Sequence, residues 1–69
     1  MKPTIRIALD VLLKDRHLTR YALAQKVGTN YQIIDNYYKN RVVRYDSDLL
    51  LRICLALDCG IEDIIKITK

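Results

Sequence analysis

The sequence predicts an all-α fold, a compact bundle of five short helices, and three observations support it. Hydrophobic residues make up 51% of the 69 residues, which suffices for one core and leaves no room for a second domain. The chain has only 2 Gly and 1 Pro, whereas a sandwich or barrel needs many turns. Apolar residues also recur at helical spacing in several segments. We therefore expect one domain over residues 1–69.

The first helix is expected to begin at about Pro3-Thr4 and to end at about Arg16-His17, where cations suit the negative end of the helix dipole. Its apolar residues follow the i, i+3, i+4, i+7, i+8 pattern of one buried face. They are Ile5, Ala8, Leu9, Leu12 and Leu13.

Two short helices joined by a tight turn are expected next. Thr19 is a favourable N-cap for the first of them, and Gly28 can end it in a left-handed conformation. Asn30 caps the second, which runs to about Lys39. Ala24 lets the two helices approach closely. The expected local core consists of Leu23, Val27, Ile34 and Tyr37, with Gln32, Asp35, Asn36 and Lys39 on the opposite, outward side.

A basic loop at residues 41–45 precedes a fourth helix at about Ser47–Leu57, which Asp46 caps. Gly60 then breaks the chain, and Ile61–Ile67 is expected to form a fifth helix with acidic residues in its first turn. The inward residues of the fourth helix are Leu50, Ile53, Cys54 and Leu57.

The net charge of +4 is unevenly distributed along the chain. Residues 19–45 carry five basic side chains and one acidic one, whereas residues 46–69 carry more acidic than basic ones. A polyanion such as DNA would be steered to the expected helix pair and the loop after it. The alternative is a generic basic surface.

Several classes of function are not expected. No apolar run approaches the ~20 residues that cross a bilayer, and no signal peptide is indicated. Cys54 and Cys59 have neither CxxC nor metal-ligand spacing, and His17 is the single His, so we expect structural thiols in a reducing cytosol and no metal or cofactor. No acid pair, activated nucleophile or Gly-rich loop indicates an enzyme.

At residues 18–29 the sequence LTRYALAQKVGT resembles the start of the helix-turn-helix of the Cro/CI-type (XRE) family of phage and bacterial repressors. Residues 46–59 resemble the fourth helix of short Cro-like members, and residues 61–65 the family's closing helix. The resemblance covers about residues 4–66. It implies a five-helix, lambda-repressor-like domain with its helix-turn-helix at about 19–39.

The resemblance also implies a function: a small transcriptional regulator, a repressor, that binds a specific double-stranded DNA sequence in the cytoplasm of a bacterial or phage-infected cell, associated with the nucleoid. Its recognition helix, residues 30–39, would enter the major groove. The base-contacting positions would be Tyr31, Gln32, Ile33 and Asn36, whose amides and apolar groups suit adenine edges and thymine methyls. The phosphate-contacting positions would be Thr19, Arg20, Lys39, Asn40, Arg41 and Arg44.

Asp35 places a negative charge beside the expected DNA surface. It could repel phosphate, pair with Lys39 one helical turn on, or accept a hydrogen bond from cytosine N4. The pair with Lys39 is the favoured interpretation. Tyr37 and Tyr38 are expected to pack in or beside the core.

Two apolar pairs lie off the main helix faces: Leu51 with Leu55, and Ile7 with Val11. Exposed apolar patches often mark partner surfaces. We expect a homodimer built on Leu51 and Leu55, with Ile64–Ile67 as a possible addition, and burial under neighbouring helices as the alternative. No sensor domain is attached, so no small-molecule effector is expected.

A second function remains open. The chain could be a protein-binding accessory, antirepressor or antitoxin-like, that keeps the fold without specific DNA binding. A DNA binder would lose affinity steeply with salt, whereas a protein-binding accessory would be nearly indifferent to salt and to DNA.

Overall fold

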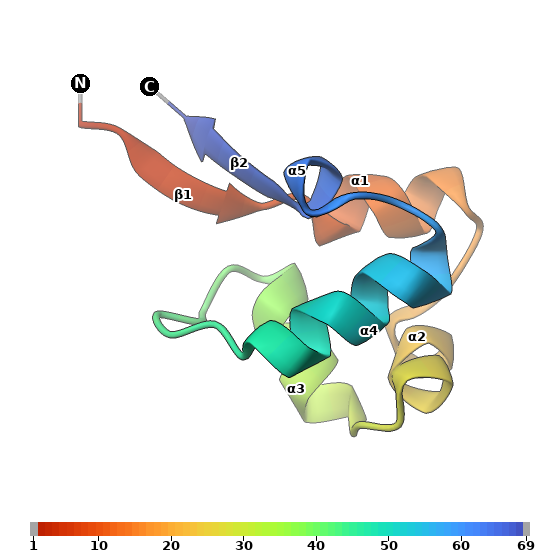
Figure 1. Cartoon of the computed structure of the whole chain (residues 1–69). Helices are drawn as coiled ribbons and strands as arrows, with labels where there is room; N and C mark the ends of the chain where they lie inside the picture. Colours follow the sequence, from red (N-terminus) through yellow and green to blue (C-terminus); the bar gives the residue numbers. More distant parts are fainter. Residues whose placement is uncertain (1, 69) are drawn as a thin grey trace.

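The computed structural model describes residues 2–68 as five helices and one two-stranded sheet (Figure 1). The elements are β1 Thr4–Ile7, α1 Leu9–Asp15, α2 Arg20–Val27, α3 Tyr31–Tyr38, α4 Ser47–Leu57, α5 Ile61–Ile64 and β2 Ile65–Thr68. The helices form the body of the molecule, and the two strands project from it as a ribbon. The five expected helices are present, but the all-α prediction is only partly right.

The strands are a correction to the sequence prediction, which placed both segments in helices. β1 and β2 pair antiparallel, with Thr4 opposite Thr68 and Ile7 opposite Ile65. Both sequences, TIRI and IKIT, are rich in β-branched residues and alternate with period two, a pattern typical of strands. Ile5 satisfies both periods, which is why the helical pattern seemed to extend to it, but its side chain is 55% exposed.

The start of α1 therefore shifts to Leu9, and one expected surface pair does not exist. Ile7 belongs to β1 and is 1% exposed, whereas Val11 on α1 is 58% exposed. Similarly, Ile64 is fully buried, so it cannot contribute to an external partner surface.

One hydrophobic core joins β1 and all five helices. It contains every residue predicted to face inward except Ile5, which is exposed, and Cys54, which is half-buried. Ile7, Leu49 and Ile64 are additional members. The largest fully buried side chains are Ile7, Leu9, Leu13, Leu23, Ile34, Ile53 and Ile64.

Four helices end at a residue in the left-handed conformation, and only one of these residues is glycine. They are His17, Gly28, Asn40 and Asp58. After each helix two backbone N–H groups bond back to its last turn, as Thr29 N–H does to the Ala24 carbonyl at 2.9 Å. This pattern satisfies carbonyls that have no partner inside the helix.

Two arginines bind the C-terminal ends of helices that lie far from them in the sequence. Arg16 Nε donates to the Leu57 carbonyl at 2.8 Å, and Arg52 Nη1 donates to the Val27 carbonyl at 2.9 Å. Each guanidinium thus occupies the negative end of another helix, where a cation is favoured. These two cations stabilise the fold itself.

Candidate nucleic-acid interface

Helices α2 and α3 and the turn at residues 28–30 form the predicted helix-turn-helix. Gly28 has φ of 75° in this turn, where a side chain would be strained. The expected N-caps are present: Thr19 Oγ1 accepts from Ala22 N–H at 3.0 Å, and Asn30 Oδ1 accepts from Ile33 N–H at 2.9 Å. Local sequence therefore fixes where both helices begin.

The outward face of α3 carries uncharged side chains. Tyr31, Gln32 and Ile33 are exposed and Asn36 is partly exposed, whereas Ile34 on the opposite side is fully buried. Gln32 Nε2 donates to Asn36 Oδ1 at 3.1 Å. The structure thus brings the four expected base-contacting side chains onto one helix.

Asp35 corrects the prediction that it faces outward. Its side chain is 7% exposed. It accepts a hydrogen bond from Arg20 Nη1 at 2.6 Å and lies 3.3 Å from Lys39 Nζ. The pair with Lys39 is confirmed, but the helical wheel of α3 could not show that the first residue of α2 covers the carboxylate.

The two cations keep Asp35 ionised. Burial alone would raise the pKa of this carboxyl, because it removes water from the charged form. The hydrogen bonds and positive charges of Lys39 and Arg20 outweigh burial and hold the pKa of Asp35 below its ordinary value of 3.8. The three side chains form an ion cluster that joins α2 to α3.

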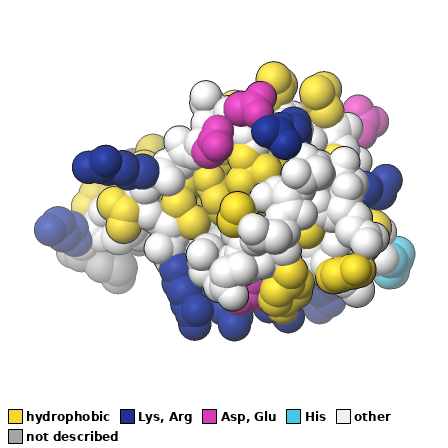
Figure 2. Space-filling model, turned by 90° about the horizontal axis from the view of Figure 1, so that it is seen from below, with side chains coloured by type: hydrophobic (Ala, Val, Ile, Leu, Met, Phe, Trp, Pro, Cys, Tyr) yellow, Lys and Arg dark blue, Asp and Glu magenta, His cyan; other side chains and the backbone are white. Residues whose placement is uncertain are grey.

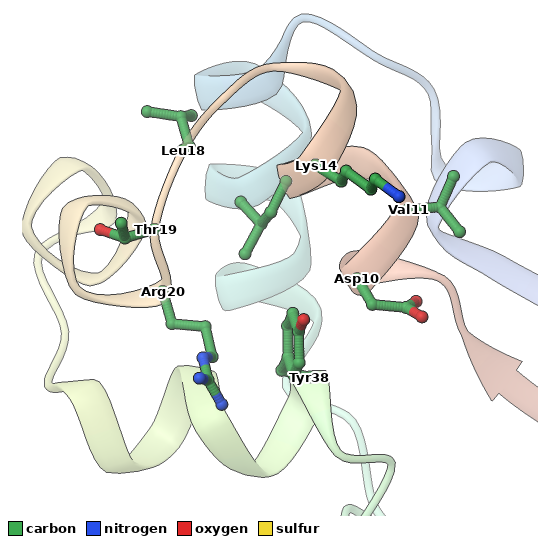
Figure 3. A pocket seen from close by; sticks show the side chains of 8 residues that line it. Asp10, Val11, Lys14, Leu18, Thr19, Arg20 and Tyr38 are labelled. Carbon is green, nitrogen blue, oxygen red and sulfur yellow. The ribbon is translucent and has the colours of Figure 1, made fainter.

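Arg20 also packs against two aromatic rings. Its guanidinium carbon lies 4.5 Å from the centre of the Tyr38 ring and 5.6 Å from that of Tyr31. Figure 3 shows Arg20 reaching from the start of α2 toward α3, with the Tyr38 ring beside it. Cations are attracted to aromatic faces at such distances, so Arg20 is held in place before any ligand arrives.

Asn40 uses its side chain inside the protein. Its Oδ1 accepts from Ile7 N–H at 2.6 Å, and its Nδ2 donates to the Ile7 carbonyl at 3.1 Å. Both polar ends of the amide are therefore engaged with β1. This contact, between residues 33 positions apart, left no signal in the sequence.

The loop after α3 presents further cations. Arg41 and Arg44 are exposed, and neither forms an ion pair with any residue in the part of the chain the structure describes. The loop is fixed at its far end, where Asp46 N–H donates to the Tyr37 hydroxyl at 3.0 Å. Tyr37 is buried and Tyr38 half-buried, as expected.

Charge is unevenly distributed on the face that α2 and α3 present. Figure 2 shows Lys and Arg side chains gathered along the lower edge, with acidic atoms among them, and acidic side chains at the upper edge beside a further basic group. Positive potential along one edge of a helix pair suits a phosphate backbone.

A groove of about 550 Å³ adjoins the start of α2 (Figure 3). Lys14 from α1 lines this groove together with Thr19 and Arg20 from the start of α2. Sequence reasoning missed Lys14 as a candidate, because its proximity to α2 arises from packing between helices.

Residues 8–69 match the sequence profile of the family described as "Cro/C1-type HTH DNA-binding domain". The chain belongs to this family. Among solved structures, the Cro/C1-type chain is similar to the transcriptional regulator VanUg, with 28% identity and a TM-score of 0.77 over 99% of this chain and 89% of that one. No curated protein matches it. The resemblance drawn from the sequence is confirmed.

For the Cro/C1-type chain, family and fold together support a role in DNA-binding transcriptional regulation. Within residues 2–68, no helix has the length and apolar character to span a membrane. In the same range no three His, Cys, Asp or Glu side chains gather where they could hold a metal ion.

Proposed function

We propose that this Cro/C1-type domain represses transcription by binding a specific double-stranded DNA site with α3 in the major groove. The observation that carries the proposal is the uncharged outward face of α3 with cations beside it. Uncharged amides and apolar groups can read base edges, while the cations contact phosphates and set the register.

Gln32 and Asn36 are proposed to read bases as a unit. The hydrogen bond between them uses one N–H of Gln32 and the oxygen of Asn36. The Gln32 oxygen, its second N–H and both N–H groups of Asn36 remain available. This set of donors and an acceptor suits an adenine edge. Holding the two side chains together lowers the entropy cost of ordering them on DNA.

Ile33 and Tyr31 extend the proposed reading surface. Ile33 is 38% exposed and offers an apolar contact to a thymine methyl. Tyr31 is 41% exposed at the start of α3, where its hydroxyl can reach backbone or base. Specificity is therefore proposed to rest on α3 alone.

Phosphates are proposed to bind around this surface. Arg41 and Arg44 contact them from the loop, and Lys39 from the end of α3. Thr19 Oγ1 already accepts a hydrogen bond from Ala22 N–H, so its O–H can donate to a phosphate near the free N–H groups at the start of α2. We add Lys14 on the other wall of the same groove.

Arg20 and Asn40 are proposed to act partly by positioning. Arg20 donates one N–H to Asp35 and keeps other donors of its five for a phosphate. Asn40 has both ends of its amide bonded to Ile7, so we propose that it orients the loop that carries Arg41 rather than contacting DNA itself.

The protein is further proposed to act as a homodimer through α4. Leu51 and Leu55 are 57% and 73% exposed. Leu51 lines an apolar groove together with Ser47, Leu50, Cys54, Ile61 and Ile65. A two-fold dimer would present two α3 helices about 34 Å apart, matching an inverted repeat.

The test is selection from random DNA duplexes, followed by binding of the selected sequence at two salt concentrations. We expect enrichment of an inverted repeat and affinity that falls steeply with salt. If no sequence is enriched and binding is weak and insensitive to salt, the DNA-binding proposal is wrong. The alternative function, an accessory that binds another protein through Leu51 and Leu55, would then be favoured.

A further inference from the structure

Cys54 and Cys59 lie on either side of the left-handed residue that ends α4. The N–H of Cys59 donates to the Cys54 carbonyl at 3.0 Å, and the N–H of Asp58 donates to the Leu55 carbonyl at 3.4 Å. In helix ends of this type, the side chains at the two positions that Cys54 and Cys59 occupy commonly contact each other. The backbone therefore turns the two thiols toward one another.

The separation of the two residues fits a disulfide bond. Given the 3.0 Å hydrogen bond, standard bond lengths limit the distance between the two Cα atoms to about 7 Å. Disulfides join Cα atoms roughly 4.4–6.8 Å apart. Both side chains are half-buried, and both pack against the same hydrophobic core, so they lie on one side of the chain.

The electrostatic environment of Cys59 agrees with this closeness. Burial raises the pKa of the Cys59 thiol, and the neighbouring Cys54 thiol and the Asp63 carboxylate raise it further. Arg16 acts in the opposite direction but does not cancel these effects. Cys59 consequently keeps its proton at neutral pH.

We propose that Cys54 and Cys59 are an oxidation site that closes to a reversible intrachain disulfide. With hydrogen peroxide as the oxidant, the Cys54 sulfur attacks one peroxide oxygen, forms a sulfenic acid and releases water. The Cys59 sulfur then attacks the Cys54 sulfur, forming the S–S bond as a second water leaves. The two thiols lose two electrons and two protons, and one peroxide becomes two waters.

The site lies at the junction of α4 and α5 (Figure 1) and includes none of the residues proposed to contact DNA. The proposal therefore does not depend on DNA binding. Cys54 also lines the apolar groove beside Leu51, so oxidation changes the wall of that groove.

Peptide mapping tests the proposal directly. The full chain is treated with hydrogen peroxide, free thiols are alkylated, and trypsin cleaves after Arg52 and Lys66 to release residues 53–66 with both cysteines. We expect this peptide to be unalkylated and about 2 Da lighter than the dithiol form. Dithiothreitol should then restore two alkylatable thiols. Two alkylated cysteines, or two peptides joined to each other, would overturn the proposal.

The kinetics separate a bond within one chain from a bond between chains. With peroxide in excess, the first-order rate constant of disulfide formation should be independent of protein concentration and larger in the folded chain than in urea. A rate constant that rises with protein concentration, or one that is equal in urea, would refute the inferred geometry. Cys54→Ser and Cys59→Ser are matched controls, and neither should give the lighter peptide. The rate measurement on the wild-type chain remains decisive if either variant fails to fold.

Discussion

Asp35 shows how far the role of a single residue could be predicted. The sequence of α3 contains its partner Lys39 one turn away, so that ion pair follows from helical spacing. Arg20, 15 positions earlier, reaches Asp35 only because α2 crosses α3. The buried state of the carboxylate therefore depends on packing that no pattern within α3 contains. The candidate base-contacting residues came from the family resemblance, and all four are exposed or partly exposed on α3.

Because the folded protein lowers the pKa of Asp35, its ionised form stabilises the fold. This stabilisation is fully present above the unfolded pKa of about 4 and is lost as the pH falls through the folded pKa. Asp35→Asn should therefore lower the free energy of unfolding at pH 7, with the difference from wild type shrinking under acid. Urea unfolding across the acid range measures both.

Asp15→Asn is the matched control, because the Asp15 side chain is 76% exposed in its pair with Arg16 and should contribute little. An unfolding free energy of Asp35→Asn that parallels wild type at every pH would contradict the assigned role of the cluster.

Asn36→Ala should weaken binding to the selected DNA site by about 1–3 kcal/mol, because it removes a base-reading amide. Binding to random DNA should change little. Titration of both duplexes at one salt concentration measures this. Gln25→Ala on the exposed surface of α2 is the control. Equal losses on both duplexes would assign Asn36 to the phosphate backbone instead.

Arg44→Ala should weaken binding to all DNA sequences alike and reduce the slope of log affinity against log salt by about one unit. The reason is that Arg44 is exposed on the loop after α3 and is proposed to neutralise one phosphate. Arg52→Ala is unsuitable as a control, because Arg52 bonds to the Val27 carbonyl. An unchanged salt slope would remove Arg44 from the interface.

At the scale of elements, the beginnings of α2, α3 and α4 were predictable because their caps are local. Thr19, Asn30 and Asp46 each accept hydrogen bonds from backbone N–H groups two or three positions later. The strands were not predictable in this way, since Thr4 bonds to a residue 64 positions away. Both strand sequences alternate with period two. For the first strand, the helical pattern that begins at Ile5 was given more weight than this alternation.

The ends of the helices predict a stabilising substitution. Asp58 ends α4 with φ of 51°, a conformation that favours glycine, and it places a negative charge at the negative end of the helix dipole. Asp58→Gly should raise the free energy of unfolding by about 0.5–1 kcal/mol. Thermal or urea unfolding checks this value.

Asp48→Gly is the matched control at the other end of the same helix. Asp48 lies in the first turn of α4 and pairs with Arg52, so its loss should destabilise the protein. Stabilisation by both substitutions, or by neither, would show that the left-handed residue carries no strain.

At the scale of the whole molecule, α4 carries apolar side chains on its outward face that the packing of a single chain does not bury. Its inward residues complete the core, whereas Leu51 and Leu55 remain exposed and Leu51 lines an apolar groove. The sequence correctly indicated that Leu51 and Leu55 are exposed, because both lie on α4, which is helical as predicted. The corresponding expectation for Ile7 was wrong because that residue belongs to β1 and is buried.

Leu55→Glu should therefore convert a homodimer to a monomer without unfolding it, since a charge at this position would be desolvated in the interface. Sedimentation equilibrium measures the change. Val43→Glu is the control, because Val43 is 90% exposed in the loop after α3 and should leave association unchanged. A wild-type chain that stays monomeric at high micromolar concentration would exclude the dimer.

The pairing of β1 with β2 has a consequence for synthesis of the protein. A ribosome makes residues 4–7 before the helices, yet their hydrogen-bonding partners are residues 65–68, which follow the helices. While the intervening chain emerges, α2 and α3 can form and pack, because their caps and their shared core are close in sequence. The first strand meanwhile has an unpaired edge, which is prone to join other chains. The surface proposed to read DNA can thus assemble without the contact that closes the fold.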